Sequence, residues 1–328
     1  MALSYETPGG DDQTSKNSPR LGTSHESYLR DLRYHSGVLR RPPPAPAQPS
    51  RSAQADVEAS SIPFADAHVH LNDPEMQLQL MEESGSRRAI VFWGRNSTNE
   101  KLVAWAREHP GRFIPFASIS PERAVYRKYW DDNDTSLLAV LEDDLKEGVV
   151  RGIGEISVTH FSGRGFPEAD YSPLHPLMRG IMELAEHYGV PVNIHCEITR
   201  IREFEQLLRT YPDVTVIWAH GGYAPYYIAN RMIAEHPNLI YELSARTWRN
   251  HPRSPDYTIW KDDVQVWPRW LRLLEENSDR FLVGTDASHH DLRREQAKIA
   301  SVVSFLAQLS PETREAVAHG NFERLIGP

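Results

Sequence analysis

The sequence predicts an α/β protein whose folded part, residues 62–328, is a (β/α)8 barrel. Two observations favour this fold: eight short apolar runs alternate with longer segments of helical periodicity, and the stretch has the size of such a barrel. A third observation is that polar residues suited to binding ligands end most of these runs. A doubly wound open sheet is the alternative fold, and it fits the third observation less well.

The apolar runs are short and rich in β-branched and aromatic residues, which is typical of buried parallel strands. Strands that alternate with helices pair in parallel, because each helix returns the chain to the same edge of the sheet. In order, the predicted strands lie within residues 62–70, 89–94, 112–120, 149–157, 190–197, 214–222, 238–246 and 280–288.

The segments between these runs carry apolar residues at helical spacing. Many of them stop at Gly or Pro, as helices often do. The clearest predicted helices lie within residues 75–85, 99–111, 137–148, 177–189, 201–212 and 224–237.

Residues 1–61 have a different composition, in which Pro, Ser, Gly and Ala dominate and large apolar residues are sparse. Such a segment cannot bury enough apolar surface to offset the entropy lost on ordering. We therefore expect a mostly disordered N-terminal extension, followed by one barrel domain over residues 62–328.

The bulk composition narrows the function classes. The formal net charge is -9 and the pI about 5.9, so we do not expect a nucleic-acid binder, which should present a basic surface. No apolar run approaches the ~20 residues that span a bilayer, and the N-terminus lacks the apolar region of a secretory signal. The single cysteine, Cys196, allows no intrachain disulfide, and a cytoplasmic location is the simplest expectation.

The stretch FADAHVHLND, residues 64–73, first raises the question of chemistry. His68 and His70 stand one residue apart in a predicted strand, so both imidazoles face the same side. Alone, the pair is as compatible with the polar start of a loop as with metal binding. The other strand ends must decide, because the active site of such a barrel lies there.

Comparable side chains stand at the ends of four other runs: Glu155 in the fourth, His195 in the fifth, His220 in the sixth and Asp286 in the eighth. Each alone has an ordinary explanation, such as a core histidine or a helix N-cap. Four imidazoles and two carboxylates on one rim, however, suit Zn²⁺ or another borderline divalent ion. We therefore predict a divalent-metal site, with zinc as the expected metal.

The motifs DAHVH, GIGEIS, NIHCE, WAHGG and VGTDAS, in this order, resemble the metal-binding strand ends of the amidohydrolase superfamily. The resemblance covers residues 62–328 and is nearest to the amidohydrolase-related branch and the TatD-type metal-dependent hydrolases. These motifs are specific for the superfamily, but they say little about the substrate.

The resemblance implies a role for each ligand candidate. His68 and His70, with Asp286, would bind the more buried metal. His195 and His220 would bind the second metal of two-metal members. Asp286 would also take the proton from the attacking water.

The number of ions depends on Glu155, which stands where TatD-type enzymes place a bridging carboxylate. Its presence favours two ions over one. In single-metal members, His195 joins the first ligand set, and His220 stays free to polarise the substrate or to move a proton.

Four residues near the predicted strand ends are candidates for substrate binding: Trp93, His160, Arg246 and Trp248. Arg246 could hold a carboxylate or phosphate, or it could form a surface salt bridge; the sequence leaves both open. Glu197 is a candidate to support His195 from behind.

These inferences predict a hydrolase that uses a metal-activated water to cleave an ester, lactone, amide or phosphoester bond in a small anionic organic substrate. The alternative is a metal-dependent non-oxidative decarboxylase of an aromatic or unsaturated carboxylic acid. The only partner expected is the small-molecule substrate, apart from a second copy of the chain. The aromatic segment 223–233 could pack between subunits of a homo-oligomer or, equally, within the core.

Overall fold

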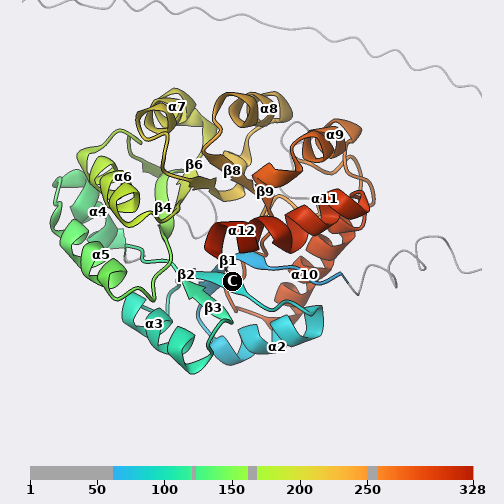
Figure 1. The fold of residues 1–328 in the computed structure, drawn as a ribbon, viewed down its shortest axis with the longest axis horizontal. Coiled ribbons are helices and arrows are strands. Elements are labelled where there is room, and N and C mark those ends of the chain that lie inside the picture. Colours follow the sequence, from blue (N-terminus) through green and yellow to red (C-terminus); the bar gives the residue numbers. More distant parts are fainter. Residues whose placement is uncertain (1–61, 120–122, 162–167, 250–257, 328) are drawn as a thin grey trace, which may run out of the picture. The chain divides into compact units, whose positions relative to one another are not determined.

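The computed structural model describes residues 62–119, 123–161, 168–249 and 258–327. They belong to one compact unit, Pro49–Pro328, whereas the extension predicted at residues 1–61 lies outside the described residues. Strands and helices alternate along the chain, and the helices surround the strands as a ring (Figure 1). The structure confirms the predicted barrel.

Eight parallel strands form the barrel wall in the described part of the chain, and a short ninth strand, β5, pairs antiparallel with the end of β4. The pairing order is β1-β2-β3 in one sheet and β5-β4-β6-β7-β8-β9 in the other. The strands are β1 Asp66–Leu71, β2 Ala89–Trp93, β3 Phe113–Pro115, β4 Ile153–His160, β5 Ala169–Asp170, β6 Val192–Cys196, β7 Val216–Trp218, β8 Leu239–Glu242 and β9 Phe281–Leu282.

The two sheets meet at both edges and close the barrel. Ala117, just after β3, bridges in parallel to Ile153 at the start of β4. Val69 in β1 bridges in parallel to Ala287, just after β9. Closure brings the C-terminal ends of all eight wall strands into one ring, where distant parts of the sequence can meet.

Helix ends follow local capping rules. The Asp73 side chain accepts a hydrogen bond from the Met76 amide at 3.0 Å and begins α2, and Asp291 does the same for α10. Asp286 therefore does not cap α10. The helices are α2 Pro74–Ser84, α3 Asn99–Glu108, α4 Arg123–Asp131, α5 Ser136–Lys146, α6 Pro176–Tyr188, α7 Ile201–Thr210, α8 Tyr226–Glu235, α9 Pro268–Glu276, α10 Leu292–Leu306, α11 Pro311–Glu315 and α12 Asn321–Ile326, with short turns η1 Ile198–Arg200, η2 Ala219–Tyr223, η3 Ser278–Arg280 and η4 Ala316–Gly320.

The last helix covers the N-terminal end of the barrel. In Figure 1, α12 crosses the centre of the ring. Its side chains Phe322 and Ile326 share a buried cluster with Phe92, Phe116 and Ile217 from or beside the wall strands. This apolar filling keeps water from one end of the barrel, so the polar strand ends form a site at the other.

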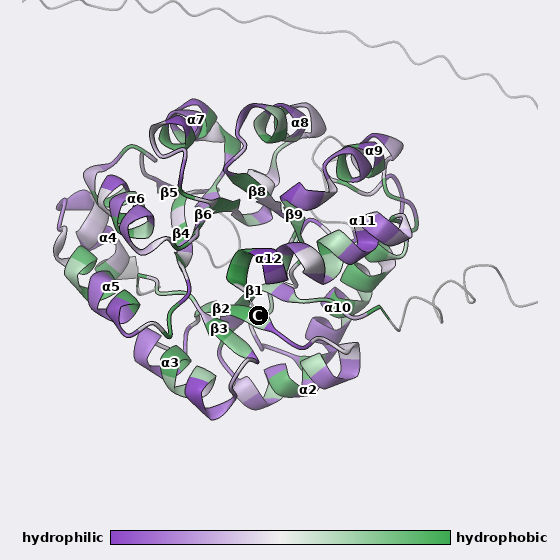
Figure 2. Ribbon diagram, in the orientation of Figure 1, coloured by the Kyte–Doolittle hydropathy of each residue, from purple (hydrophilic) through white to green (hydrophobic). Residues whose placement is uncertain are grey.

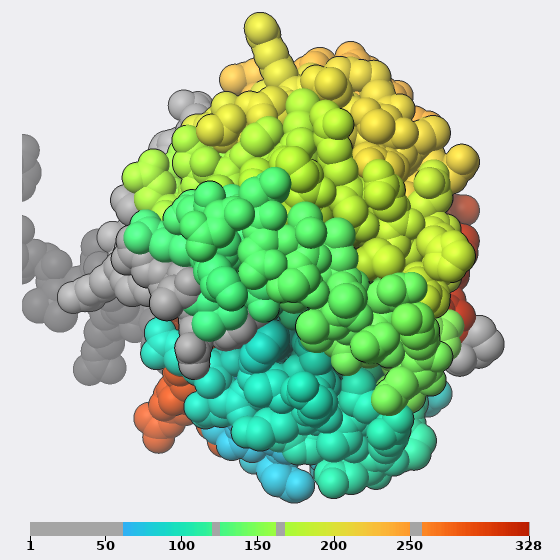
Figure 3. All heavy atoms as spheres, turned by 90° about the vertical axis from the view of Figure 1, so that its left-hand side faces the viewer, coloured from blue at the N-terminus to red at the C-terminus, as the bar shows by residue number. Residues whose placement is uncertain are grey.

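Hydropathy follows the same layering. Apolar residues concentrate on the strands and on the helix sides that face them (Figure 2). On the face drawn in Figure 3, residues of successive helices from α3 to α7 lie side by side as the outer surface. Among the helices that the structure describes, none is both long and apolar enough to cross a membrane.

The aromatic segment that includes α8 packs mainly into the core. Ala229, Met232 and Ile233 are buried, whereas Tyr227 is 69% exposed. Core packing therefore accounts for most of its apolar residues, and an oligomer contact stays a prediction.

Candidate metal centre

The six predicted ligand residues lie together at the C-terminal ends of the strands. His68 and His70 belong to β1, and Glu155 belongs to β4. His195 is in β6, His220 follows β7 in η2, and Asp286 follows β9. The complete set is His68, His70, Glu155, His195, His220 and Asp286. Closure of the barrel, rather than proximity in sequence, brings them to one place.

The two histidines of β1 each direct a ring nitrogen toward both carboxylates, Glu155 and Asp286. His68 Nε2 lies 3.4 Å from His70 Nε2 and 3.6 Å from Glu155 Oε2. His70 Nε2 lies 3.3 Å from the same carboxylate oxygen. Asp286 Oδ1 lies 3.9 Å from His68 Nε2 and 3.7 Å from His70 Nε2. Each of these two imidazole nitrogens thus faces one oxygen of Glu155 and one oxygen of Asp286.

These separations fit a divalent cation. Four tetrahedral ligands about 2.0–2.2 Å from Zn²⁺ stand roughly 3.3–3.6 Å from one another, close to the observed range of 3.3–3.9 Å. The donor set of nitrogen and carboxylate oxygen also suits zinc, manganese, cobalt or iron. The residues present therefore fit such a metal.

The other oxygen of Glu155 faces the second pair of histidines. Glu155 Oε1 lies 2.9 Å from His195 Nδ1 and 3.4 Å from His220 Nε2. The rings of these two histidines are 4.9 Å apart. The two oxygens of one carboxylate are thus divided between two pairs of imidazoles.

Glu242 orients histidines of both pairs, and the sequence analysis did not find it. Its side chain, at the end of β8, is fully buried. Its Oε2 faces His68 Nδ1 at 3.2 Å and accepts hydrogen bonds from the His220 amide at 3.1 Å and the Ser244 hydroxyl at 2.7 Å. Such a partner fixes the imidazole tautomer, leaving His68 Nε2 for a cation. A carboxylate within the seventh predicted strand, residues 238–246, was the available signal.

The remaining histidines are held in a similar way. His70 Nδ1 lies 3.1 Å from the Trp93 carbonyl, and His195 Nε2 lies 3.3 Å from Glu197 Oε1. Trp93 was predicted to bind substrate, and the structure shows its main chain supporting a ligand candidate. Glu197 lies where the sequence placed it, behind His195.

The carboxylates make this site strongly negative. Burial disfavours charge on Glu155, but His68 and hydrogen bonds from the other histidines hold its pKa well below the usual range. Burial would lower the pKa of His68, yet Glu155 raises it well above the usual range. For His195 burial is likewise outweighed by Glu155 and Glu197, so its pKa rises to about 9. A bound cation would be favoured for the same electrostatic reason as these protons.

A clamp of buried and half-buried side chains holds the loop that carries Asp286. Lys298 donates from Nζ to the Asp286 carbonyl at 2.6 Å and pairs with Glu295 at 2.9 Å. The Trp248 indole donates to the Thr285 carbonyl at 3.2 Å, and its ring lies 4.8 Å from Lys298 Nζ. Trp248 therefore supports this loop, and its predicted contact with substrate stays a prediction.

Arg246 lies inside the protein. It has no exposed surface; its Nη2 donates to the Ala224 carbonyl at 3.0 Å, and its Cζ lies 5.4 Å from the ring of Trp270. Burial lowers the pKa of this guanidinium. The predicted alternative of a surface salt bridge is therefore wrong, because the side chain is fully enclosed. Substrate binding by Arg246 stays a prediction.

His160 and Cys196 lie near the centre with different surroundings. His160 ends β4, is half-buried, and has its ring 4.7 Å from that of His195. Cys196 is fully buried, and burial raises the pKa of its thiol to about 12. A thiol so protected is no candidate nucleophile.

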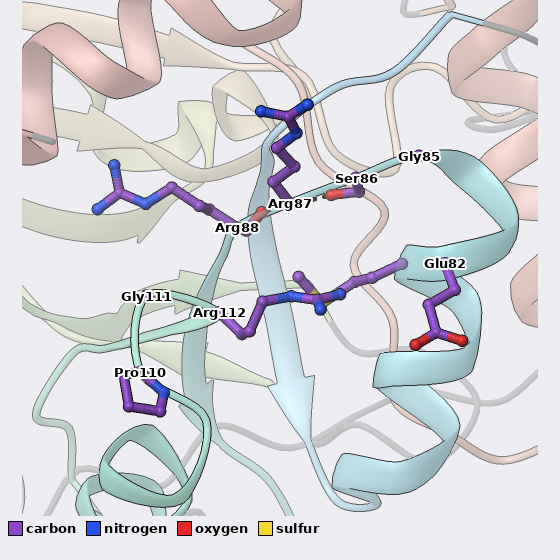
Figure 4. Close-up of a pocket in the computed structure, with 9 residues that line it drawn as sticks. Glu82, Gly85, Ser86, Arg87, Arg88, Pro110, Gly111 and Arg112 are labelled. Carbon is purple, nitrogen blue, oxygen red and sulfur yellow. Dashed lines mark hydrogen bonds between the residues drawn. The ribbon is translucent and has the colours of Figure 1, made fainter.

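A surface groove of about 550 Å³ lies at the opposite end of the barrel (Figure 4). It is lined by residues that precede β2 and β3, including Arg87, Arg88 and Arg112. Arg88 pairs with Glu323 and donates to the Gly327 carbonyl at 2.6 Å, which ties α12 to the barrel. The groove is therefore separate from the candidate centre.

The fold and the site together define a class of proteins: closed parallel barrels with a site suited to divalent cations. Here the strand ends bring together four imidazoles and several carboxylates. The family described as Amidohydrolase matches residues 69–327. The chain belongs to the amidohydrolase family. The TatD-type branch stays a prediction.

One curated relative is an uncharacterized metal-dependent hydrolase of Haemophilus influenzae, 24% identical over 133 residues. The match covers 40% of this chain, and the chain spans about half the length of that relative (51%).

Solved structures of similar fold include enzymes of three kinds. A 4-oxalomesaconate hydratase from Rhodopseudomonas palustris has a TM-score of 0.54 and 15% identity, covering 80% of this chain and 95% of that one. A dihydroxybenzoic acid decarboxylase from Polaromonas, with bound manganese, has a TM-score of 0.50 and 15% identity, covering 81% and 97%. A probable 2-pyrone-4,6-dicarboxylic acid hydrolase from Acinetobacter baumannii has a TM-score of 0.50 and 12% identity, covering 82% and 100%. Identities this low show the shared fold and leave the reaction open.

Proposed function

We propose that this protein is a metal-dependent hydrolase that cleaves an ester, lactone, amide or phosphoester bond in a small anionic organic substrate. The observation that carries the proposal is the position of Glu155. One of its oxygens faces His68 and His70, and the other faces His195 and His220. A carboxylate shared in this way suits two cations, and paired cations serve hydrolysis well.

Each residue of the centre has a proposed part. His68, His70, Glu155 and Asp286 would hold one ion, and Glu155, His195 and His220 would hold the other. Bound divalent ions would lower the pKa of water from about 15.7 toward 7 and polarise the substrate. We propose zinc, because imidazole and carboxylate ligands in a tetrahedral arrangement suit it.

Proton transfer falls to Asp286 when His220 serves as a ligand; with a single ion, His220 would also be free to polarise the substrate or to move a proton. The Asp286 side chain is 22% exposed and can reach a bound water while its main chain is held by Lys298. Burial opposes its charge, but His220, His68 and Lys298 lower its pKa, so it is ionised and able to accept a proton. His220 Nδ1 faces the Ser244 carbonyl and hydroxyl, so its Nε2 is kept toward the centre as a ligand atom.

A second candidate function is metal-dependent decarboxylation of an aromatic or unsaturated carboxylic acid. The observation that favours it is the four-residue set His68, His70, Glu155 and Asp286, which could hold a single ion by itself. His220 would then be free to protonate the carbon from which carbon dioxide departs. A similar fold in a manganese-containing decarboxylase is compatible with this alternative.

Elemental analysis of the purified full chain, combined with a substrate screen, tests the proposal. We expect two divalent ions per chain and turnover on at least one lactone, ester, amide or phosphoester carrying a carboxylate. A protein that holds one ion and releases carbon dioxide from aromatic acids, with no hydrolysis, would be a decarboxylase instead. We further propose that residues 62–328 suffice for catalysis, that residues 1–61 are an extension, and that the protein is cytoplasmic.

A further inference from the structure

We propose that His160, His195 and Glu197 form an additional cation site beside the candidate centre, suited to Zn²⁺, Co²⁺ or a similar divalent transition metal. The inference rests on the proposed function, because it gives the second ion of that centre an alternative position. The three side chains offer one ligand atom each within 4.8 Å of one another, with two nitrogens and one oxygen as the donor set.

The three residues come from two adjacent strands that hold them rigidly. His160 ends β4, and Glu197 directly follows β6, which pairs with β4. The Glu197 amide donates to the Thr159 hydroxyl at 2.7 Å, so the main chain of Glu197 is fixed beside His160. His195 Nε2 lies 3.3 Å from Glu197 Oε1, a separation that two ligands of one cation commonly show.

Glu197 lacks part of the compensation that a buried carboxylate needs. Its side chain is only 2% exposed, and its Oε2 makes no hydrogen bond within the residues that the structure describes. A buried carboxylate oxygen without a donor is costly unless a cation lies nearby. The neighbouring His160 ring, whose centre lies 4.7 Å from that of His195, supplies the third ligand and the second nitrogen of the set. Its Nδ1 lies 2.6 Å from the Phe161 carbonyl, a contact that helps to hold the ring in place.

The additional site, called here the outer position, shares His195 with the inner position formed with Glu155 and His220. Only one of the two positions can therefore hold a cation at a time. His195 Nδ1 faces Glu155 at 2.9 Å, and its Nε2 faces Glu197. A neutral imidazole has one acceptor nitrogen and one N–H. With the proton on Nε2, His195 serves the inner position with Glu155 and His220. With the proton on Nδ1, it serves the outer position with Glu197 and His160, so the tautomer selects where the second ion lies.

Cobalt titration of the metal-depleted full chain tests this site without reference to turnover. The variants are Glu197→Gln and His160→Asn, with His187→Asn, an exposed histidine on α6, as a matched control. Binding is followed by visible Co²⁺ absorption and by competition with a chelator. We expect both variants to weaken the second Co²⁺ by ~10-fold or more and to change its absorption, while the first Co²⁺ and the control stay unchanged.

The two variants separate the possible outcomes. If Glu197→Gln weakens the second ion but His160→Asn does not, Glu197 merely orients His195, and the additional site is refuted. If both variants bind Co²⁺ as the wild-type protein does, the additional site is also refuted, and the proposed function is left intact. A wild-type protein that binds no Co²⁺ at all overturns both proposals. If circular dichroism shows that Glu197→Gln does not fold, the Co²⁺ titration of His160→Asn, which changes a half-buried residue, still tests the additional site.

Discussion

The substitution Glu242→Gln would show whether a buried carboxylate outside the ligand set controls metal binding. Glu242 Oε2 faces three donor groups: His68 Nδ1, the His220 amide and the Ser244 hydroxyl. Its Oε1 accepts from the Ser244 amide. Gln is nearly isosteric, so the variant changes charge and hydrogen bonding with little change in packing.

The expected losses of stability and of metal affinity follow from how the substituted side-chain amide must be oriented. With its oxygen at the Oε2 position, Gln keeps the three contacts in which that oxygen is the acceptor. Its NH₂ then faces the Ser244 amide N–H, and two donors that face each other leave one hydrogen bond unmade. A buried unsatisfied group costs about 1–3 kcal/mol of unfolding free energy. Loss of the charge that fixes the His68 tautomer should weaken the metal by about 10–100-fold. At about 1.4 kcal/mol per factor of ten, this is roughly 1.4–2.8 kcal/mol of binding free energy.

Chelator competition measures metal affinity, and urea denaturation of the metal-free protein measures stability. Glu276→Gln, at an exposed position of α9, is the matched control and should change neither. If Glu242→Gln binds metal as tightly as the wild type, then the contacts to His68 and His220 do not orient the site, and the reasoning fails.

Three further predictions concern the same region. Asp286→Asn should reduce turnover by at least ~100-fold with the fold intact, because an amide cannot accept the proton; wild-type activity in this variant would exclude Asp286 as the base. Lys298→Met should weaken metal binding by ~10-fold, because Nζ holds the Asp286 carbonyl, and an unchanged chelator competition would show that the clamp is unimportant. Cys196 should resist iodoacetamide at pH 8 until the protein unfolds, since its thiol is buried with a pKa of about 12; labelling of the native chain, seen by mass spectrometry, would contradict this.

The sequence could predict the barrel because its signals are local. Alternation of apolar runs with helical segments is a property of neighbouring residues, and eight repeats leave few possible topologies. The rim position of His68, His195 and Asp286 then follows from the rule that parallel strands end on one side. Metal chemistry also follows from residue type alone, since imidazole and carboxylate are what such ions prefer.

Only the tertiary structure decided how these groups face one another. Glu242 contacts His68 across 174 positions of sequence, and no local pattern signals such a contact. Arg246 stands in a loop after a strand, where exposure was the natural expectation, yet packing encloses it completely. Which nitrogen of each imidazole points inward likewise depends on acceptors brought in by other strands. Local sequence sets which elements form, whereas tautomer, burial and ligand distance are fixed by neighbours that meet only when the barrel closes.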